Sequence, residues 1–186
     1  MVSDNTLNVQ VANRIPKSEA THEFNPGRME AVQMMHQANK VSGGCLCGAV
    51  RYEAEVFLHN GYICHCTICQ RSTGQPAEIT VLIKAGTLKY LKTEPKYYVS
   101  STSGKRGFCA DCGSRIVWQA LAPEDDWLTN VTVGTLDQPS EARMTRHICA
   151  DTQLPWYDPC PHLPKLTADE GDRLIALLRA EVSPEG

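Results

Sequence analysis

The stretch Cys64-His65-Cys66-Thr67-Ile68-Cys69 places three thiols within six residues, shortly after an Asn60-Gly61 turn signal. Thiolates this close repel one another and oxidise readily unless a metal binds them. Zinc is the usual ion, held by cysteine sulfur at about 2.3 Å in a tetrahedral shell. Three ligands leave a fourth position open, as catalytic zinc sites do, unless another part of the chain closes it. The spacing alone favours neither the catalytic nor the structural alternative.

Length and composition predict one cytoplasmic domain. The 186 residues are enough for a single domain, and a hydrophobic fraction of 42% is enough for a buried core. The net charge of -3 gives no electrostatic reason to expect nucleic acid or an anionic membrane as a partner. No apolar run approaches the roughly 18 residues of a membrane span, and the N-terminus lacks the apolar segment of a signal peptide.

The cysteines point to metal binding rather than to disulfides. The chain has nine, an odd number, and seven of them stand in Cys-x-Cys or Cys-x-x-Cys spacings. Disulfide frameworks belong to secreted proteins, whereas such spacings in a protein without an export signal are typical of metal sites. We therefore expect a reducing cytosol and metal ligation.

Three segments are expected along the chain. Residues 1–40 are largely polar and aperiodic, which predicts an N-terminal extension, either with a short helix over Arg28–Asn39 or as a frayed tail. The core domain is expected over 41–166. A C-terminal helix docked on that domain is expected over 167–186.

The C-terminal helix has a defined start. Thr167 and Glu170 form a capping box, in which each side chain satisfies a free backbone N–H of the first turn. The helix is expected over Ala168–Ala180. Its apolar stripe would consist of Leu174, Leu177 and Leu178.

Strand patterns fill the core domain. The first is an alternation that places four apolar residues on one face: Val50, Tyr52, Ala54 and Val56. Asn60-Gly61 is a strong two-residue hairpin signal, so we expect the chain to return along this strand through Tyr62–Cys66. Short strands at such spacing predict a mainly β fold with antiparallel pairing. The other expected strands are Glu78–Ile83, Thr87–Leu91, Lys96–Ser100, Lys105–Cys109, Arg115–Gln119 and Trp127–Val133.

The hairpin also predicts how the cysteines divide between metal sites. In a simple register residue 55 pairs with 66, which leaves Cys47 eight residues along the strand, roughly 26 Å away at 3.3 Å per residue. One coordination sphere does not span that distance, so two sites are expected. The closed, structural site would comprise Cys45, Cys47, Cys109 and Cys112, and the open one Cys64, Cys66 and Cys69.

The cysteines stand in longer motifs, and these resemble a known family. The motifs are Gly44-Cys45-x-Cys47-Gly48-Ala49-Val50-x-Tyr52, Cys64-His65-Cys66-x-x-Cys69, Thr73-Gly74 and Phe108-Cys109-x-x-Cys112-Gly113. From Val41 to about Leu166 the chain resembles the glutathione-dependent formaldehyde-activating enzymes, a family that includes centromere protein V. His147-Ile148 and Pro155-Trp156-Tyr157 are similar to its C-terminal signature. The resemblance implies a β-tent-like fold with a structural zinc on four cysteines and a catalytic zinc on three.

Several residues around the motifs are candidates for the site. Arg71 would meet a carboxylate of an acidic thiol, His147 would donate to substrate, and Trp156 would wall the pocket. The alternatives are a solvated surface arginine, a structural histidine and a tryptophan that caps the core. His65 is expected to point away from the metal, because it stands between two ligands.

The chain departs from the family pattern in three ways. The extension over 1–40 lies outside the family core, and Gln70 stands where many members carry arginine. Cys149 and Cys160 lie outside the motifs and are expected to be buried small hydrophobes or incidental thiols. Cys149 is the residue that would close the open site if it supplied a fourth ligand.

The chemistry of an open three-thiolate zinc favours a thiol substrate. Zinc deprotonates a coordinating thiol outright, whereas a free thiol of pKa about 8.5 is only about 3% thiolate at pH 7. The resemblance implies reversible addition of glutathione or a similar thiol to formaldehyde or another small aldehyde. The enzyme would be a carbon–sulfur lyase similar to S-(hydroxymethyl)glutathione synthase, with two zinc ions per chain. The alternatives are a non-enzymatic, zinc-stabilised binding module and a thiol-adduct carrier, and the oligomeric state stays open.

Overall fold

The computed structural model describes residues 36–122 and 127–182 of the chain. Within them the fold is mainly β, as predicted, and the strands form two sheets. The smaller sheet has three antiparallel strands in the spatial order β1 (Asn39–Gly44), β2 (Arg51–Val56) and β5 (Lys89–Tyr90). The larger has seven, in the order β10 (Met144–Ile148), β3 (Gly61–Cys64), β4 (Glu78–Leu82), β9 (Thr129–Thr132), β8 (Arg115–Ala120), β7 (Gly104–Phe108) and β6 (Lys96–Val99).

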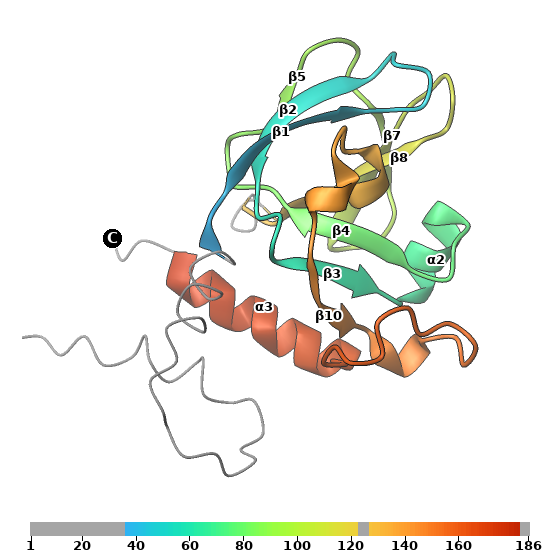
Figure 1. The fold of residues 1–186 in the computed structure, drawn as a ribbon, viewed down its shortest axis with the longest axis vertical. Coiled ribbons are helices and arrows are strands. Elements are labelled where there is room, and N and C mark those ends of the chain that lie inside the picture. Colours follow the sequence, from blue (N-terminus) through green and yellow to red (C-terminus); the bar gives the residue numbers. More distant parts are fainter. Residues whose placement is uncertain (1–35, 123–126, 183–186) are drawn as a thin grey trace, which may run out of the picture.

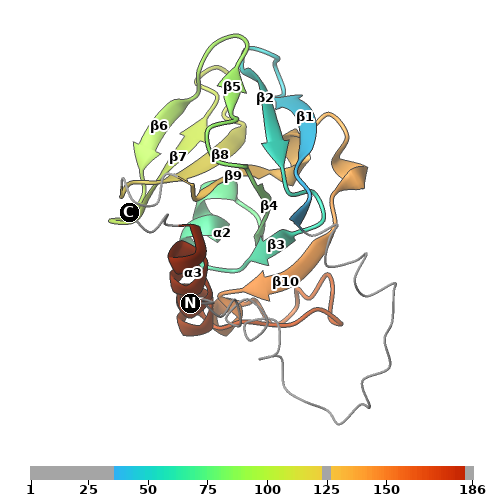
Figure 2. The same ribbon diagram turned by 90° about the vertical axis from the view of Figure 1, so that its left-hand side faces the viewer.

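Two α-helices flank the larger sheet. The short α2 (Thr67–Thr73) directly follows β3, and the long α3 (Ala168–Val182) lies along the end of the sheet that carries β3 and β10, away from the smaller sheet (Figures 1 and 2). The predicted capping box starts α3: the Thr167 N–H donates to Glu170 Oε2 at 2.8 Å, and the Glu170 N–H donates to Thr167 Oγ1 at 3.3 Å. None of the helices in the described part of the chain is long and apolar enough to cross a membrane.

The hydrophobic core lies between the two sheets. The alternation predicted for β2 is confirmed, since Tyr52 and Val56 are fully buried and Ala54 nearly so. These side chains belong to one buried cluster with apolar residues of the larger sheet, among them Val81 of β4 and Val117 of β8. These apolar side chains lie directly between the two sheets, so the sheets must approach closely. Full burial of one large apolar side chain contributes roughly 1.5–3 kcal/mol to stability.

The two sheets are joined at Tyr52. Its hydroxyl lies 2.9 Å from the Thr135 hydroxyl, in the short helix η4 (Val133–Thr135) that follows the larger sheet. Gly43 of β1 lies over the same contact, and a Cβ at Gly43 would come within 2.4 Å of both the Thr135 carbonyl oxygen and the Tyr52 hydroxyl. Only glycine leaves room for this approach of β1.

The predicted hairpin at Asn60-Gly61 is wrong. β2 pairs with β1 and β5, whereas β3 pairs with β4 on one side and β10 on the other, so the two strands belong to different sheets. The pairing of β10 with β3 is also parallel, which the sequence did not predict. Gly61 packs against β10, because a Cβ there would meet the end of the Met144 side chain at 2.3 Å.

Other boundaries also differ from the sequence-based expectation. The strand β1 begins at Asn39, where the extension was expected to end in a helix, and the rest of the predicted helix lies outside the described residues. The strands β1 and β10 and the helix α2 were not predicted. In α3, Leu177 was expected in the apolar stripe but is 49% exposed. Ile175, which was not in that stripe, lines a cavity described below.

We expect Gly43→Ala to lower the free energy of unfolding by roughly 1–3 kcal/mol, the usual cost of overpacking a filled site. The methyl group would displace either the Tyr52 ring or the η4 backbone. Urea denaturation followed by tryptophan fluorescence measures the change. The matched control is Gly134→Ala, because a Cβ at Gly134 meets nothing within 4 Å. Equal midpoints for both variants would contradict the proposed joint.

Candidate metal centres

The first group of cysteines, Cys45, Cys47, Cys109 and Cys112 (the first cluster), comes from two tight turns. One turn connects β1 to β2: the Cys45 N–H donates to Val50 O at 3.1 Å, and the Gly48 N–H donates to Cys45 O at 3.1 Å. The other turn connects β7 to β8. In it the Cys109 N–H donates to Ser114 O and the Gly113 N–H donates to Cys109 O, both at 2.9 Å. Gly48 and Gly113 have φ values of 76° and 75°, which favour glycine.

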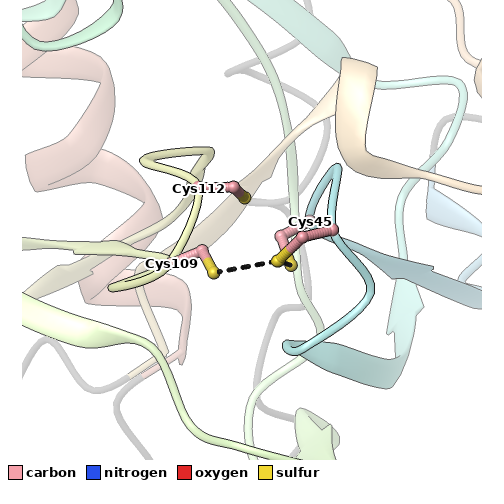
Figure 3. A group of neighbouring side chains, drawn as sticks. Cys45, Cys109 and Cys112 are labelled. Atoms are coloured by element: carbon pink, nitrogen blue, oxygen red, sulfur yellow. Dashed lines mark hydrogen bonds between the residues drawn. The ribbon is translucent and has the colours of Figure 1, made fainter.

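The four sulfurs of the first cluster fit one tetrahedral metal ion. All lie within 4.8 Å of one another. The Sγ atoms of Cys45 and Cys47 are 3.5 Å apart, and those of Cys47 and Cys109 are 3.7 Å apart. A tetrahedral zinc with bonds of about 2.3 Å requires sulfurs about 3.8 Å apart, close to both distances. The sulfurs of Cys45, Cys109 and Cys112 point toward a common centre (Figure 3).

Ser114 connects the two turns of the first cluster and was missed in the sequence. Its Oγ accepts a hydrogen bond from the Leu46 N–H at 3.1 Å and lies 3.2 Å from Cys112 Sγ. Hydrogen bonding to Ser114 lowers the pKa of the Cys112 thiol to about 5, so this ligand is readily a thiolate. A serine two residues after a cysteine is a common pattern, so the sequence does not indicate that Ser114 contacts a cysteine of the cluster.

The second group, Cys64, Cys66 and Cys69 (the second cluster), lies where β3 passes into α2. Cys64 ends β3, Cys66 is the N-cap residue of α2, and Cys69 lies within the helix. The three sulfurs lie within 4.8 Å of one another, and the Cys69 N–H donates to Cys66 Sγ at 3.3 Å. The prediction of two separate clusters agrees with this geometry, although the hairpin register from which it was argued is wrong.

The second cluster borders a cavity of about 240 Å³. Its apolar lining includes Trp118 of β8, Leu128 just before β9, Ile148 of β10 and Ile175 of α3. Next to it lies a groove of about 570 Å³, which shares Ile68 and Arg106 with the cavity. In the first cluster, by contrast, the four sulfurs already complete a tetrahedron.

Arg106 is the cation closest to the second cluster and was missed in the sequence. It is only 7% exposed, and its Nη2 donates to Cys69 Sγ at 3.5 Å while its Nη1 bonds the Ser100 hydroxyl. Its Nε has no hydrogen-bond partner among the described residues. Arg106 lies on β7, 37 residues from Cys69, so only the fold reveals the contact.

A buried ion pair lies beside this arginine. Arg115 Nη2 is 3.0 Å from Glu78 Oε1, and both side chains are almost fully buried. Since these two charges offset each other, Arg106 is left to balance the negative charge of the thiolates. Asn130 lines the same cavity, donates to the Tyr62 hydroxyl at 2.9 Å, and leaves its Oδ1 without a partner among the described residues.

The two histidines form a link between β3 and β10, on the side away from the sulfurs. His147 Nε2 donates to Cys160 O at 3.0 Å, so its Nδ1 accepts from His65 Nε2 at 2.8 Å. Both side chains are fully buried, and burial lowers the pKa of His65. His65 therefore points away from the second cluster, as expected, and His147 is not among the residues that line the cavity.

The other two candidate substrate contacts differ in position. Arg71, in the last turn of α2, lines the groove beside the cavity together with Arg106 and Arg115. Trp156 is 72% exposed and lines neither the cavity nor the groove. The structure thus brings Arg71 near the second cluster and leaves His147 and Trp156 outside its cavity.

Of the two cysteines outside the motifs, Cys149 adjoins the second cluster. Interaction with the Cys149 thiol is the largest influence on both neighbouring groups: it raises the pKa of Cys64 and lowers that of Cys66. Cys160 accepts the His147 hydrogen bond through its carbonyl oxygen and is partly buried.

We expect the two clusters to respond differently to loss of one sulfur. Cys109→Ser should unfold the protein, because a structural zinc contributes roughly 10–16 kcal/mol in peptide models, as much as the stability of a domain. Cys66→Ser should leave a folded protein that has lost about one zinc per chain. Metal analysis and circular dichroism of both variants check this. The same response in both would contradict the division into two clusters.

Ser114→Ala should weaken metal binding at the first cluster alone. Loss of a hydrogen bond to a ligand usually lowers metal affinity by about 10- to 100-fold. Competition with a chromophoric chelator measures this affinity. Ser72→Ala is the control, since the Ser72 hydroxyl bonds only the Cys69 carbonyl oxygen. An unchanged affinity in Ser114→Ala would show that the hydroxyl merely fills space.

The family of the chain follows from comparison with known proteins. The search of curated proteins found no match. Among solved structures, one similar chain is a protein of Rhodobacter sphaeroides, a structural genomics target. It is 20% identical with a TM-score of 0.40, and the match covers 67% of this chain and 98% of that one. The family model for glutathione-dependent formaldehyde-activating enzymes matches residues 40–152, more than half of the chain. The chain therefore belongs to the glutathione-dependent formaldehyde-activating enzyme family.

Proposed function

We propose that the protein catalyses reversible addition of a thiol, glutathione or a similar one, to formaldehyde or another small aldehyde. The reaction forms a carbon–sulfur bond and an S-hydroxyalkyl adduct, so in reverse the enzyme is a carbon–sulfur lyase. The observation that supports this best is the second cluster, whose three sulfurs border a cavity beside a buried arginine. Nine free cysteines fit a reducing compartment, which supports a cytoplasmic location.

Zinc suits both clusters by the chemistry of their ligands. Thiolate sulfur selects zinc over magnesium or calcium, which prefer oxygen. Cys45, Cys47, Cys109 and Cys112 would hold a structural ion. Cys64, Cys66 and Cys69 would hold a second ion, which when bound ionises a thiol at its remaining position.

The residues around the second cluster supply positioning and charge balance. The apolar wall excludes water from the cavity, which strengthens the electrostatic interactions inside it. The Arg106 guanidinium stabilises negative charge on sulfur, and its free Nε can donate to an aldehyde oxygen that gains charge as the thiol adds. Asn130 Oδ1 can accept the hydroxyl hydrogen of the adduct. Holding thiol and aldehyde together supplies most of the rate enhancement, because proximity can be worth roughly 7–11 kcal/mol.

The groove beside the cavity favours an acidic thiol. The cavity of about 240 Å³ is smaller than a usual ligand pocket, so it suits a thiol end and a small aldehyde. The groove is larger, at about 570 Å³, and contains three arginines. Of these, Arg71 forms no ion pair with any described residue. It is free to meet a carboxylate of glutathione.

We expect Arg71→Ala to weaken glutathione binding about two- to fivefold, equivalent to roughly 0.4–1 kcal/mol for an exposed ion pair. Binding of uncharged 2-mercaptoethanol should not change. Isothermal titration with each thiol, at low and high salt, checks both statements, and the difference should shrink at high salt. Lys96→Ala, which removes an exposed cation outside the groove, is the control. An equal loss for both thiols would mean that Arg71 does not recognise the carboxylate.

Exchange of formaldehyde with glutathione should be faster with the wild type than with Cys66→Ser or without protein. Cys66→Ser removes one sulfur of the second cluster and leaves the first cluster complete. Exchange spectroscopy between free glutathione and its S-hydroxymethyl adduct measures the rate. Equal rates in all three samples, with thiol binding retained in the wild type, would leave a thiol-adduct carrier. Absence of thiol binding would leave a zinc-stabilised binding module.

A further inference from the structure

The strand pairing brings Cys149 to the second cluster. β10 runs parallel to β3, with Ile148 directly opposite Cys64, and the His65 N–H donates to Ile148 O at 3.0 Å. Cys149 is the next residue, so it leaves the sheet at the level where Cys64, His65 and Cys66 leave β3. Its proximity to the cluster depends on two strands 80 residues apart in the sequence.

The backbone of Cys149 is held in an unusual conformation. With φ at 54° it is the only non-glycine residue of the described chain in the left-handed region, which L side chains rarely adopt. Thr152 holds the turn, because its hydroxyl donates both to Cys149 O at 3.1 Å and to His65 O at 3.0 Å. The short helix η6 (Ala150–Thr152) begins immediately afterwards. The same hydroxyl thus ties Cys149 to the segment that carries the ligands.

The Cys149 thiol interacts with two of the three thiols of the second cluster. Hydrogen bonding with the Cys149 thiol is the largest cause of the shifted pKa of both neighbours: it raises the pKa of Cys64 and lowers that of Cys66. It is not a member of the set of sulfurs that all lie within 4.8 Å of one another. Cys149 therefore lies beside Cys64 and Cys66 without completing a tetrahedron, which requires sulfurs about 3.8 Å apart.

We infer that Cys149 supplies the fourth sulfur of the second centre in the resting protein and leaves when a substrate thiol takes that position. This inference rests on the proposed function, because it assigns an internal competitor to the site where the substrate thiol would bind. The small movement needed falls on one residue, at the start of a three-residue helix. The resting centre would be closed to water and to oxidants.

The exchange balances in protons and charge. The incoming thiol loses its proton and the departing Cys149 thiolate gains it, so the charge of the centre is the same before and after. With four thiolates and zinc that charge is -2, and Arg106, bonded to Cys69 Sγ, offsets half of it. Cys149 would then remain beside the bound substrate as a neutral thiol.

The competition lowers the apparent affinity for substrate thiols. If Cys149 occupies the fourth position in about nine of ten molecules, the open form is about one tenth of the total, and apparent binding is about tenfold weaker than at an open centre. Removing the competitor should therefore strengthen thiol binding. If Cys149 instead contacted the substrate favourably, its removal would weaken thiol binding.

Cadmium NMR separates the two centres in one spectrum, because ¹¹³Cd in a four-sulfur shell resonates downfield of ¹¹³Cd with three sulfurs and an oxygen. The full chain is loaded with ¹¹³Cd under a phosphine reductant, as wild type, Cys149→Ser, Cys149→Ala and the control Cys160→Ser. We expect both wild-type resonances in the four-sulfur range. One of them should move upfield in both Cys149 variants and return on addition of 2-mercaptoethanol, while Cys160→Ser matches the wild type. The Cys149 variants should bind 2-mercaptoethanol about tenfold more tightly.

Two other results are distinguishable. A wild-type resonance already in the three-sulfur range, unchanged in the Cys149 variants and shifted downfield by 2-mercaptoethanol, would overturn the role of Cys149 and leave the proposed function intact. Two four-sulfur resonances that 2-mercaptoethanol alters in no protein, with no thiol binding by titration, would overturn the proposed function and the inference together.

Discussion

The joint between the two sheets depends on how the four sulfurs of the first cluster are held together, and these sulfurs could bind one metal ion. The first cluster takes two sulfurs from the turn after β1 and two from the turn after β7, and these turns belong to different sheets. Without a metal, four thiolates would repel one another, and the hydrogen bond from Leu46 to Ser114 would still connect the two turns. With a metal they fix the smaller sheet against the larger one at the end opposite α3 (Figure 1). The Tyr52–Thr135 contact and the apolar core then complete the joint.

The second cluster uses the same ligand chemistry in a different setting. Its three sulfurs come from one short stretch at the end of β3 and the start of α2, so no distant strands depend on it. It borders a cavity, and its charge is balanced by Arg106 from β7. On the proposed function, the first cluster would hold a structural metal and the second a metal whose ligand shell changes, which is the usual separation between structural and catalytic zinc.

Local patterns predicted much of this arrangement. The alternation around Tyr52, the capping box at Thr167 and the spacing of the motif cysteines are short-range signals, and the structure agrees with each. Long-range pairing was not predictable in the same way. Asn60-Gly61 resembles a hairpin turn, yet β3 pairs with β4 and β10, and Met144 of β10 lies close to Gly61. The same parallel pairing brings Cys149 to the cluster, and the β6–β7–β8 meander brings Arg106 to it. The sequence offered Cys149 only as an alternative fourth ligand, and it gave no sign of Arg106.

The central claim is that the two clusters hold two metals with different roles, one for the fold and one for exchange. Native mass spectrometry during slow titration with a chelator, with near-ultraviolet circular dichroism recorded in parallel, tests it most directly. The account predicts two zinc ions per chain that leave in two steps. The first should leave with the spectrum of the folded protein unchanged and the capacity to bind 2-mercaptoethanol lost, and the second should leave only as the protein unfolds. A single zinc per chain, or two that leave together with the fold, would contradict it.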